Sequence, residues 1–332
     1  MMAVFAALQT VMTLRRVVLT LAALGCVPLT ALAQAFPSKP ITFVVPFTAG
    51  SATDQLARAL AQAITQDGKA TVVVDNKPGA NAFIGAQQVA RAKPDGYTVL
   101  IATNTTHAAN EHLFKKLPYD PVKDFEPISA LGRGGQIMVV NPTKLPVNNV
   151  MDFVKLAKAN PGKYSFGSGS SSSRIAGEMF KQLTGTYIVS IPYRSNPPAV
   201  TDLIGGQIDV MFTDMPTGLP QVKAGKLKAL GVTPRQRSPL APELPTLEQA
   251  GVKGYEMTYW FAAYAPAGTP AAEVAKLNEL LHKAARGSAT ATFFQPTGTE
   301  VFLNTPDEQR RFQQAESQKW GRIIKSAGIE PE

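Results

Sequence analysis

The chain has 332 residues, of which 45% are hydrophobic and 17% charged, and its formal net charge is +9. Its Lys and Arg residues are scattered and aromatic residues do not alternate with them, which argues against a nucleic-acid partner. The single cysteine, Cys26, offers no disulfide framework. We therefore expect a chain stabilised by core burial, with a mild positive field that attracts small anions.

The first 35 residues have the pattern of a secretory signal peptide. Arg15 and Arg16 precede an apolar stretch over 17–29, and Ala31-Leu32-Ala33 is a small-x-small cleavage signal. The apolar stretch is too short for a membrane anchor. We expect export to the periplasm, with cleavage near Ala33 or Ala35, and a mature chain long enough for two domains.

The first stretch of the mature chain predicts a strand, a tight turn and a helix. Residues 41–45 form a continuous apolar run, typical of a strand buried on both faces. Leu56, Leu60 and Ile64 then recur at helical spacing. Small and hydroxyl side chains over 48–53 leave backbone N–H groups bare at the helix N-terminus, which favours anion binding. The alternative is an ordinary capped helix, in which Ser51 and Asp54 form a capping box.

Strands and helices then alternate, which predicts an α/β fold with mainly parallel sheets. We expect strands over 70–75 and 97–102, with a helix over 81–91 between them. A polar segment over 103–106 ends the second of these strands. Residues 125–141 predict a strand, broken at Gly132-Arg133-Gly134-Gly135, that crosses into a second lobe, and residues 151–160 predict a helix.

A second strand, glycine/serine loop and helix follow at 164–185. Tyr164 begins a short strand, and the loop Gly167-Ser-Gly-Ser-Ser-Ser-Ser173 leads into a helix with Ile175, Met179 and Leu183 on its apolar face. Gly185 is expected to end this helix. The alternative, a flexible serine-rich linker, fits poorly between a strand and a periodic helix.

The remaining elements complete two lobes. Strands are predicted over 187–193, 208–212 and 227–232, with a helix over 199–204 stopped by Gly205 and Gly206. A strand over 259–264 is expected to return to the first lobe. We assign 36–134 and 254–332 to lobe 1 and 135–253 to lobe 2.

The last third is predicted to be helical. Thr269-Pro270 and Thr305-Pro306 each have the pattern of an N-cap threonine followed by proline, and Glu308 completes a capping box with Thr305. The apolar face of the final helix is expected to pack on lobe 1 through these residues: Phe312, Trp320, Ile323 and Ile324.

Enzyme signatures are missing from the sequence. His107, His112 and His282 lack metal-ligand spacing, so we expect no metal. There is no Gly-x-Ser-x-Gly, no complete dinucleotide fingerprint and no phosphate-binding Gly-Lys-Ser/Thr, so we expect no cofactor. One catalytic alternative stays open, a triad formed in space by Ser170, His107 and Asp214.

Binding fits the pattern better, because polar loops follow the strands at the edge where open α/β sheets bind ligands. Hydroxyl and backbone N–H groups are neutral donors that hold a carboxylate without a full ion pair. Two facing helix N-termini could hold both ends of a dicarboxylate. Arg194 either adds charge or is a solvated surface residue. The candidate ligand-binding residues are Phe47, Thr48, Ala49, Gly50, Ser51, Asn104, Thr105, Ser168, Ser170, Ser171, Ser172, Ser173, Arg194 and Asp214.

Several segments in order resemble the extracytoplasmic solute receptors of the tripartite tricarboxylate transporter family, often called Bug proteins. They are Pro-Ser-Lys-Pro-Ile at 37–41, Pro-Phe-x-x-Gly-x-x-x-Asp at 46–54, Pro-Asp-Gly-Tyr-Thr at 94–98, Leu-Pro-Tyr-Asp-Pro at 117–121, Asp-Leu-Ile-Gly-Gly-Gln-Ile-Asp at 202–209, Ala-Gly-Lys-Leu-Lys-Ala-Leu at 224–230 and Ala-Pro-Ala-Gly-Thr-Pro at 265–270. Ser51 departs from the family pattern, which usually has a second Gly there. This departure bears on ligand identity rather than on the fold.

The resemblance implies a periplasmic binding protein with two α/β lobes that close on a ligand in the cleft between them. It implies carboxylate ligands: citrate-like acids, dicarboxylates, acidic amino acids or aromatic acids. In the family, the loops that are here 47–53 and 168–173 contact the ligand carboxylate, often through water. We expect a monomer that delivers its ligand to membrane permease subunits. The alternatives are a periplasmic ligand sensor for a signalling partner and a periplasmic serine hydrolase.

Overall fold

The fold is organised around one sheet system whose two halves share a single long strand. The computed structural model describes residues 36–332, where ten strands follow the order β2-β1-β3-β9-β4-β7-β5-β6, with β8 and β10 also paired to β4. The predicted signal peptide lies outside the described residues. The strands are β1 (Ile41–Val45), β2 (Val72–Asn76), β3 (Thr98–Thr103), β4 (Phe125–Val140), β5 (Ser165–Ser168), β6 (Val189–Pro192), β7 (Val210–Asp214), β8 (Lys228–Val232), β9 (Thr258–Pro266) and β10 (Glu300–Val301).

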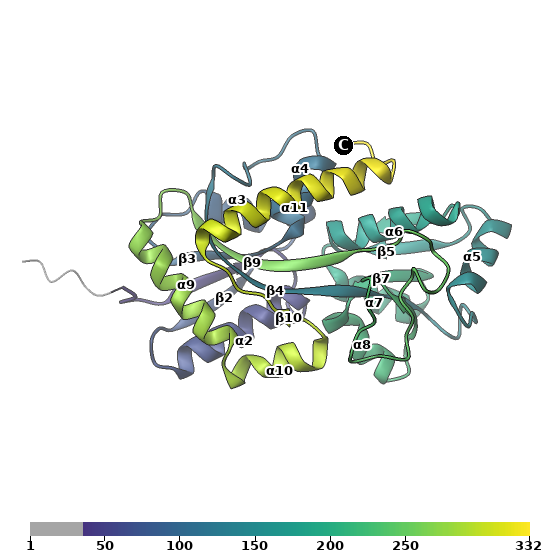
Figure 1. Ribbon diagram of the computed structural model, residues 1–332, viewed down its shortest axis with the longest axis horizontal. Helices are drawn as coiled ribbons and strands as arrows, with labels where there is room; N and C mark the ends of the chain where they lie inside the picture. The colour runs from purple at the N-terminus through teal and green to yellow at the C-terminus, as the bar shows by residue number, and fades with distance from the viewer. Residues whose placement is uncertain (1–35) are drawn as a thin grey trace, which may run out of the picture. The chain divides into compact units, whose positions relative to one another are not determined.

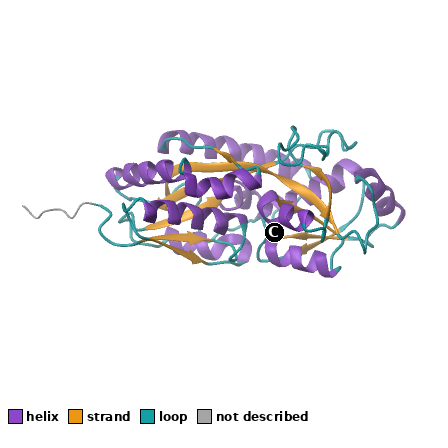
Figure 2. Cartoon of the chain, turned by 90° about the horizontal axis from the view of Figure 1, so that it is seen from below, coloured by secondary structure: helices purple, strands orange, loops and turns teal. Residues whose placement is uncertain are grey.

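Helices cover the sheet in both lobes (Figures 1 and 2). We call the lobe around β1, β2 and β3 the first lobe, and the lobe around β5, β6 and β7 the second lobe. The helices are α2 (Ala52–Gln66), α3 (Phe83–Ala90), α4 (Asn110–Leu113), α5 (Val150–Ala159), α6 (Ser171–Thr184), α7 (Asn196–Gly205), α8 (Met215–Lys223), α9 (Ala271–Ala285), α10 (Ser288–Thr297), α11 (Pro306–Ser326), a 3₁₀ turn η1 (Ala80–Ala82) and a π-helical turn η2 (Thr105–Ala109).

Strands β4 and β9 lie side by side through the middle of the molecule and connect the lobes (Figure 1). Residues 125–135 of β4 pair with β9, and residues 136–140 pair with β7 of the second lobe. Both predicted crossovers are confirmed. The predicted mainly parallel sheet is only partly right: β1 is parallel to β2 and β3, and β5 to β6 and β7, but β4 and β9 are antiparallel to their neighbours.

The predicted break at 132–135 is wrong, because β4 continues through these glycines. Instead of forming a turn, these glycines allow other residues to pack closely on the strand. A Cβ on Gly134 would lie 2.7 Å from the Tyr259 hydroxyl, and one on Gly135 would lie 2.1 Å from Pro234. The strand thus keeps its pairing while other elements pack directly on its backbone.

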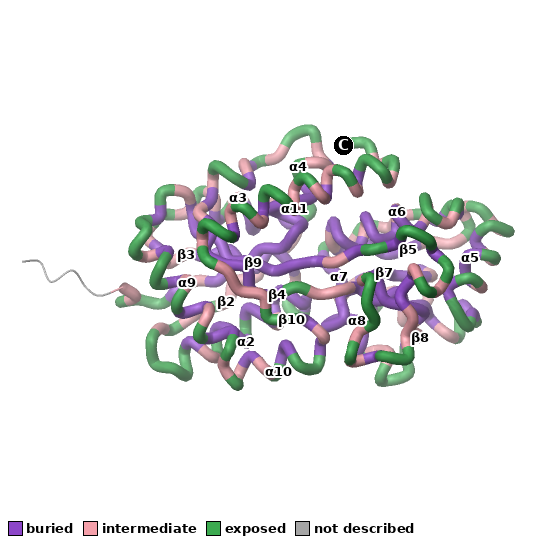
Figure 3. The backbone as a smooth tube through the Cα atoms, in the orientation of Figure 1, coloured by how far each residue is buried: buried purple, intermediate pink, exposed green. Residues whose placement is uncertain are grey.

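The core forms on both faces of the sheet (Figure 3). Alternate residues of β1 belong to different clusters: Val44 packs toward α3, whereas Ile41, Phe43 and Val45 pack toward α2 and α9. The first cluster continues into the second lobe beneath α5 and α6, passing Trp260 of β9. The predicted burial of β1 on both faces is therefore confirmed, and the two lobes share apolar core.

Three helix predictions have different outcomes. The capping box of Thr305 and Glu308 is confirmed. Thr269 is not an N-cap, since α9 begins at Ala271 and the Thr269 hydroxyl donates to the Pro266 carbonyl instead. Leu183 is 40% exposed, because each four-residue step turns about 40° around the helix and carries this residue away from the buried side that holds Ile175.

Helix α11 lies against η2 and β4 of the first lobe, as predicted. Trp320 and Ile324 are buried, and Phe312 and Ile323 are partly buried against the same core. Residues 36–332 form one compact unit, so the residue boundaries assigned to the lobes stay a prediction. Within these residues no helix combines the length and hydrophobicity that a bilayer span requires.

We predict that His107 makes stability depend on pH. Its ring is fully buried, stacked on Tyr264 at 3.8 Å, and burial lowers its pKa to about 3. Below an unfolded pKa of about 6.5 the unfolded chain binds a proton that the folded chain does not, so stability falls as pH falls. Between about pH 7 and pH 5 the loss due to this residue is about 2 kcal/mol.

Urea unfolding of the wild type and His107→Phe at both pH values measures this effect. Phenylalanine keeps an aromatic ring in the stack and removes the titration. The variant is expected to lose less unfolding free energy than the wild type on acidification. An equal loss in both proteins would contradict the assignment.

Candidate ligand pocket

The first wall of the candidate pocket is the start of α2. The Ser51 hydroxyl accepts from the Asp54 backbone N–H at 3.3 Å, which is half of the predicted capping box. The Asp54 carboxylate does not complete it; it accepts instead from the Gly50 N–H at 2.8 Å and pairs with Arg58 at 3.0 Å. Asp54 therefore holds the turn in place and leaves the N–H groups of the first helical residues facing the cleft.

The second wall is the start of α6, where the capping box is complete. The Ser170 hydroxyl accepts from the Ser173 N–H, and the Ser173 hydroxyl accepts from the Gly169 and Ser170 N–H groups at 3.0 Å. Ser171 donates to Asn110 of the first lobe at 2.8 Å. The serine run is thus an ordered turn rather than a flexible linker.

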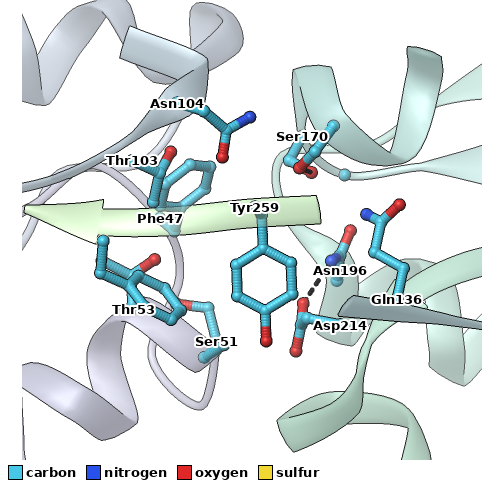
Figure 4. A pocket seen from close by; sticks show the side chains of 14 residues that line it. Phe47, Ser51, Thr53, Thr103, Asn104, Gln136, Ser170, Asn196, Asp214 and Tyr259 are labelled. Carbon is cyan, nitrogen blue, oxygen red and sulfur yellow. Dashed lines mark hydrogen bonds between the residues drawn. The ribbon is translucent and has the colours of Figure 1, made fainter. Parts of the chain in front are cut away.

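A pocket lies between these two helix starts (Figure 4). Its cavity volume is about 40 Å³, which is room for roughly three water molecules or a small ligand. The two lobes are in contact beside the pocket, where the Thr48 and Ser195 hydroxyls are hydrogen-bonded to each other. The pocket is lined by Phe47, Ser51, Ala52, Thr53, Thr103, Asn104, Tyr259 and Phe261 from the first-lobe side and crossover strand, and by Gln136, Gly169, Ser170, Ser172, Asn196 and Asp214 from the other side.

The structure brings six of the predicted site residues together in this lining: Phe47, Ser51, Asn104, Ser170, Ser172 and Asp214. The others lie beside it. Ser168, Ser171 and Ser173 are buried in the turn before α6 or in its first residues, and Thr105 is buried at the start of η2. Ala49, Gly50 and Arg194 are exposed, and Thr48 forms the contact between the rims.

Sequence reasoning missed the floor of the pocket. Gln136 and Tyr259 belong to the crossover strands β4 and β9, whose residues look like ordinary strand positions in the sequence. The signal that could have found them is the crossing itself, because strands that join two lobes pass beneath the cleft. Asn196 belongs to the predicted polar loop 194–196, which reaches the pocket through this residue rather than through Arg194.

Four buried polar atoms in the lining have no hydrogen-bond partner: Asn104 Nδ2, Gln136 Oε1, Asn196 Oδ1 and the Tyr259 hydroxyl. Leaving a buried polar atom unpaired costs about 1–3 kcal/mol. So many unpaired atoms around one small cavity indicate that their partner is a ligand or ordered water.

Asp214 is the acidic residue of the lining. Its carboxylate accepts from Asn196 Nδ2 and from the N–H and hydroxyl of Thr217, at 2.9 and 2.6 Å. Burial raises its pKa, and burial together with the nearby Asp214 charge raises the pKa of Tyr259. No lysine or arginine is among the described residues that line the pocket.

The catalytic triad that the sequence left open as an alternative does not form. Ser170 is hydrogen-bonded to Ser172 and Ser173, His107 to Thr106, and Asp214 to Asn196 and Thr217. His107 is fully buried against Phe125 and Tyr264 in the core. Among residues 36–332, no group of His, Cys, Asp or Glu side chains is placed to hold a metal ion.

Residues 56–329 match the family model described as the tripartite tricarboxylate transporter family receptor. The chain belongs to this receptor family. The family predicted from the sequence is therefore confirmed.

Relatives of this receptor cover nearly its whole length. Protein BugT of Bordetella pertussis is 32% identical over 89% of this chain and 91% of its own. Among solved structures, Rhodopseudomonas palustris Rpa4515 with adipate superposes with a TM-score of 0.86 at 33% identity, covering 90% of this chain and 100% of that one. MatC from R. palustris with bound malate has a TM-score of 0.82 at 28% identity, covering 87% and 100%.

These relatives are receptors and binding proteins, and the two-lobed fold of periplasmic binding proteins is confirmed for this receptor. The structure named periplasmic binding protein BugD superposes with a TM-score of 0.85 at 33% identity, over 90% of this chain and 100% of that one.

We predict that Gly169→Ala disrupts the pocket of this receptor. A Cβ on Gly169 would lie 2.0 Å from the Ser195 backbone carbon and 2.3 Å from the Asn196 nitrogen. Because backbone atoms cannot move aside cheaply, the start of α7 must shift, at a cost of about 1–3 kcal/mol. The melting temperature and any ligand affinity are both expected to fall.

Gly205→Ala is the matched control. The same added methyl group in α7 would meet only Gln207, at 4.0 Å, and alanine favours helix. Differential scanning calorimetry is expected to give a wild-type or slightly higher melting temperature for this variant. If Gly169→Ala were as stable as Gly205→Ala, the close packing at Gly169 would be contradicted.

Proposed function

We propose that this receptor binds a small organic carboxylate in the periplasm and delivers it to a tripartite tricarboxylate-type membrane transporter. The observation that carries the proposal is the facing of two helix N-termini across one pocket, with the unpaired Asn104 Nδ2 aimed into it. A helix N-terminus carries about half a positive charge and free N–H donors. The family and the adipate and malate complexes of its relatives support the ligand class.

The donors of this site suit capture followed by release. The start of α2 supplies N–H groups at Ala52 and Thr53, and the start of α6 supplies the hydroxyls of Ser170 and Ser172. A hydrogen bond to a charged group contributes about 1.5–3 kcal/mol. Several such bonds hold an anion firmly only while both walls are close, so opening the cleft releases it.

Two hydrogen bonds between the lobes hold the starts of α2 and α6 close to each other. Thr48 of the first lobe bonds Ser195 of the second, and Ser171 of α6 bonds Asn110 at the end of η2. These contacts join the lobes without an ion pair. We infer that a transporter subunit recognises this closed arrangement, and that the receptor acts as an exported monomer cleaved near Ala33 or Ala35.

We expect calorimetric titration of the mature protein with mono-, di- and tricarboxylates to detect binding of at least one acid. Asn104→Asp replaces the free donor by a charged acceptor of the same shape, while the oxygen that accepts from the Trp260 N–H is kept. The affinity for that acid is expected to fall at least about tenfold.

Asn148→Asp is the control, since it makes the same charge change at an exposed position outside the pocket. It is expected to bind the acid as the wild type does. A folded wild-type protein that stays silent across the panel would contradict the proposed function.

A further inference from the structure

The pocket combines donors at its helix starts and at Asn104 with acceptors at Asn196 and Asp214. The amide of Asn104 has a fixed orientation, because its Oδ1 accepts from the Trp260 N–H. Its Nδ2 therefore points away from that bond and is left without a partner. The two helix N-termini add N–H and hydroxyl donors to the same cavity.

The amide of Asn196 is also fixed. Its Nδ2 donates to the Asp214 carboxylate, which accepts only, so its Oδ1 is the atom left buried and unpaired. The Gln136 oxygen is also unpaired, but Figure 4 shows the Gln136 amide with its nitrogen toward the pocket, so Asn196 and Asp214 supply the acceptors. Figure 4 shows Gln136, Asn196 and Asp214 together on one side of the pocket, across from Asn104 and Phe47.

The Asp214 carboxylate adds an acceptor and a charge. Thr217 donates twice to Oδ1, but only Asn196 donates to Oδ2, which leaves a lone pair of Oδ2 available. None of the ion pairs within residues 36–332 includes Asp214, whereas Asp54, equally buried at the start of α2, is paired with Arg58. Three protein donors and the N-terminus of α8 stabilise this carboxylate, and a donor on a ligand would pair the remaining lone pair of Oδ2.

An ordinary helix cap explains only part of this arrangement. Asp214 is the N-cap of α8, and that role accounts for the two bonds from Thr217 to Oδ1. It does not account for the unpaired oxygens of Asn196 and Gln136, or for the unpaired Tyr259 hydroxyl beside the carboxylate. Asn196 and Tyr259 are both residues that line the cavity.

We propose that the ligand of this receptor carries a hydrogen-donating group, an ammonium or a primary amide, opposite its carboxylate, and that Asp214 and Asn196 select it. This inference rests on the proposed function, which places the carboxylate at the helix N-termini. A dicarboxylate would set its second anion against Asp214 and the Asn196 oxygen. An ω-amino acid or a monoamide would instead satisfy these acceptors.

Ligands matched in backbone length test the proposal. The mature protein is titrated calorimetrically with succinate, succinamate and β-alanine, and with adipate, its monoamide and 5-aminopentanoate. In at least one set, the amide or amino acid is expected to bind at least about tenfold tighter than the diacid. Equal or tighter binding of the diacid would overturn the inference and leave the proposed function standing, whereas silence toward every acid would overturn both.

Asp214→Asn tests whether Asp214 selects the donor group of the ligand. Asparagine is as good an N-cap as aspartate, so α8 keeps its start. The Asn196 amide is then free to rotate and to present its Nδ2 to the cavity. The preference over the diacid is expected to fall at least about tenfold or to reverse.

Asp202→Asn is the matched control, because it removes a carboxylate from α7 outside the pocket lining. Its preference is expected to equal that of the wild type. Asp214→Ser, also a good N-cap, replaces Asp214→Asn if the latter fails to fold. An unchanged preference in a folded Asp214 variant would overturn the role of this residue.

Discussion

The structure depends on two sets of unsatisfied backbone N–H groups that are held face to face. A helix cannot bond its first N–H groups internally, and α2 and α6 both begin at the same small cavity. Side-chain caps order each turn without filling the cavity: Asp54 holds the first turn, and Ser173 holds the second. The pocket is therefore a consequence of where helices start, since Asn196 and Asp214 stand at the starts of α7 and α8 as well, and we propose that these neutral dipoles attract the anion.

Strands β4 and β9 bring these two helix starts together. β4 pairs with β9 in the first lobe and with β7 in the second, so one backbone carries both halves of the sheet. Glycines at 134 and 135 let Tyr259 and Pro234 pack directly on this strand. The same crossing places Gln136 and Tyr259 in the lining of the pocket, so the connection between the lobes forms part of the candidate site.

The sequence predicted the elements whose signals lie within a few neighbouring residues. Apolar periodicity located β1 and α2, and the glycine and serine pattern located the turn before α6, because both signals lie within a few residues. It did not predict that β4 is continuous, because glycines such as Gly134 and Gly135 usually interrupt a strand. Here they are needed because residues distant in the sequence pack closely against them. Leu183 has near-helical spacing, but two four-residue steps carry it about 80° around the helix from Ile175, to an exposed position.

The site could be predicted where its residues follow a strand and not where they lie within one. Ser51, Asn104 and Ser170 stand at strand ends, where parallel topology gathers polar loops. Tyr259 and Gln136 depend on the register of two antiparallel strands, which the sequence does not reveal. The arrangement of donors and acceptors in the pocket was also hidden, because it depends on which way the Asn104 and Asn196 amides are held by distant partners.

A crystal structure of the mature protein with its tightest-binding acid tests the central claim most directly. We predict that the ligand carboxylate lies between α2 and α6, at about 3 Å from Asn104 Nδ2 or from backbone N–H groups at the two helix starts, directly or through one water. A carboxylate held by lysine or arginine side chains, or a ligand bound outside this cavity, would contradict the account.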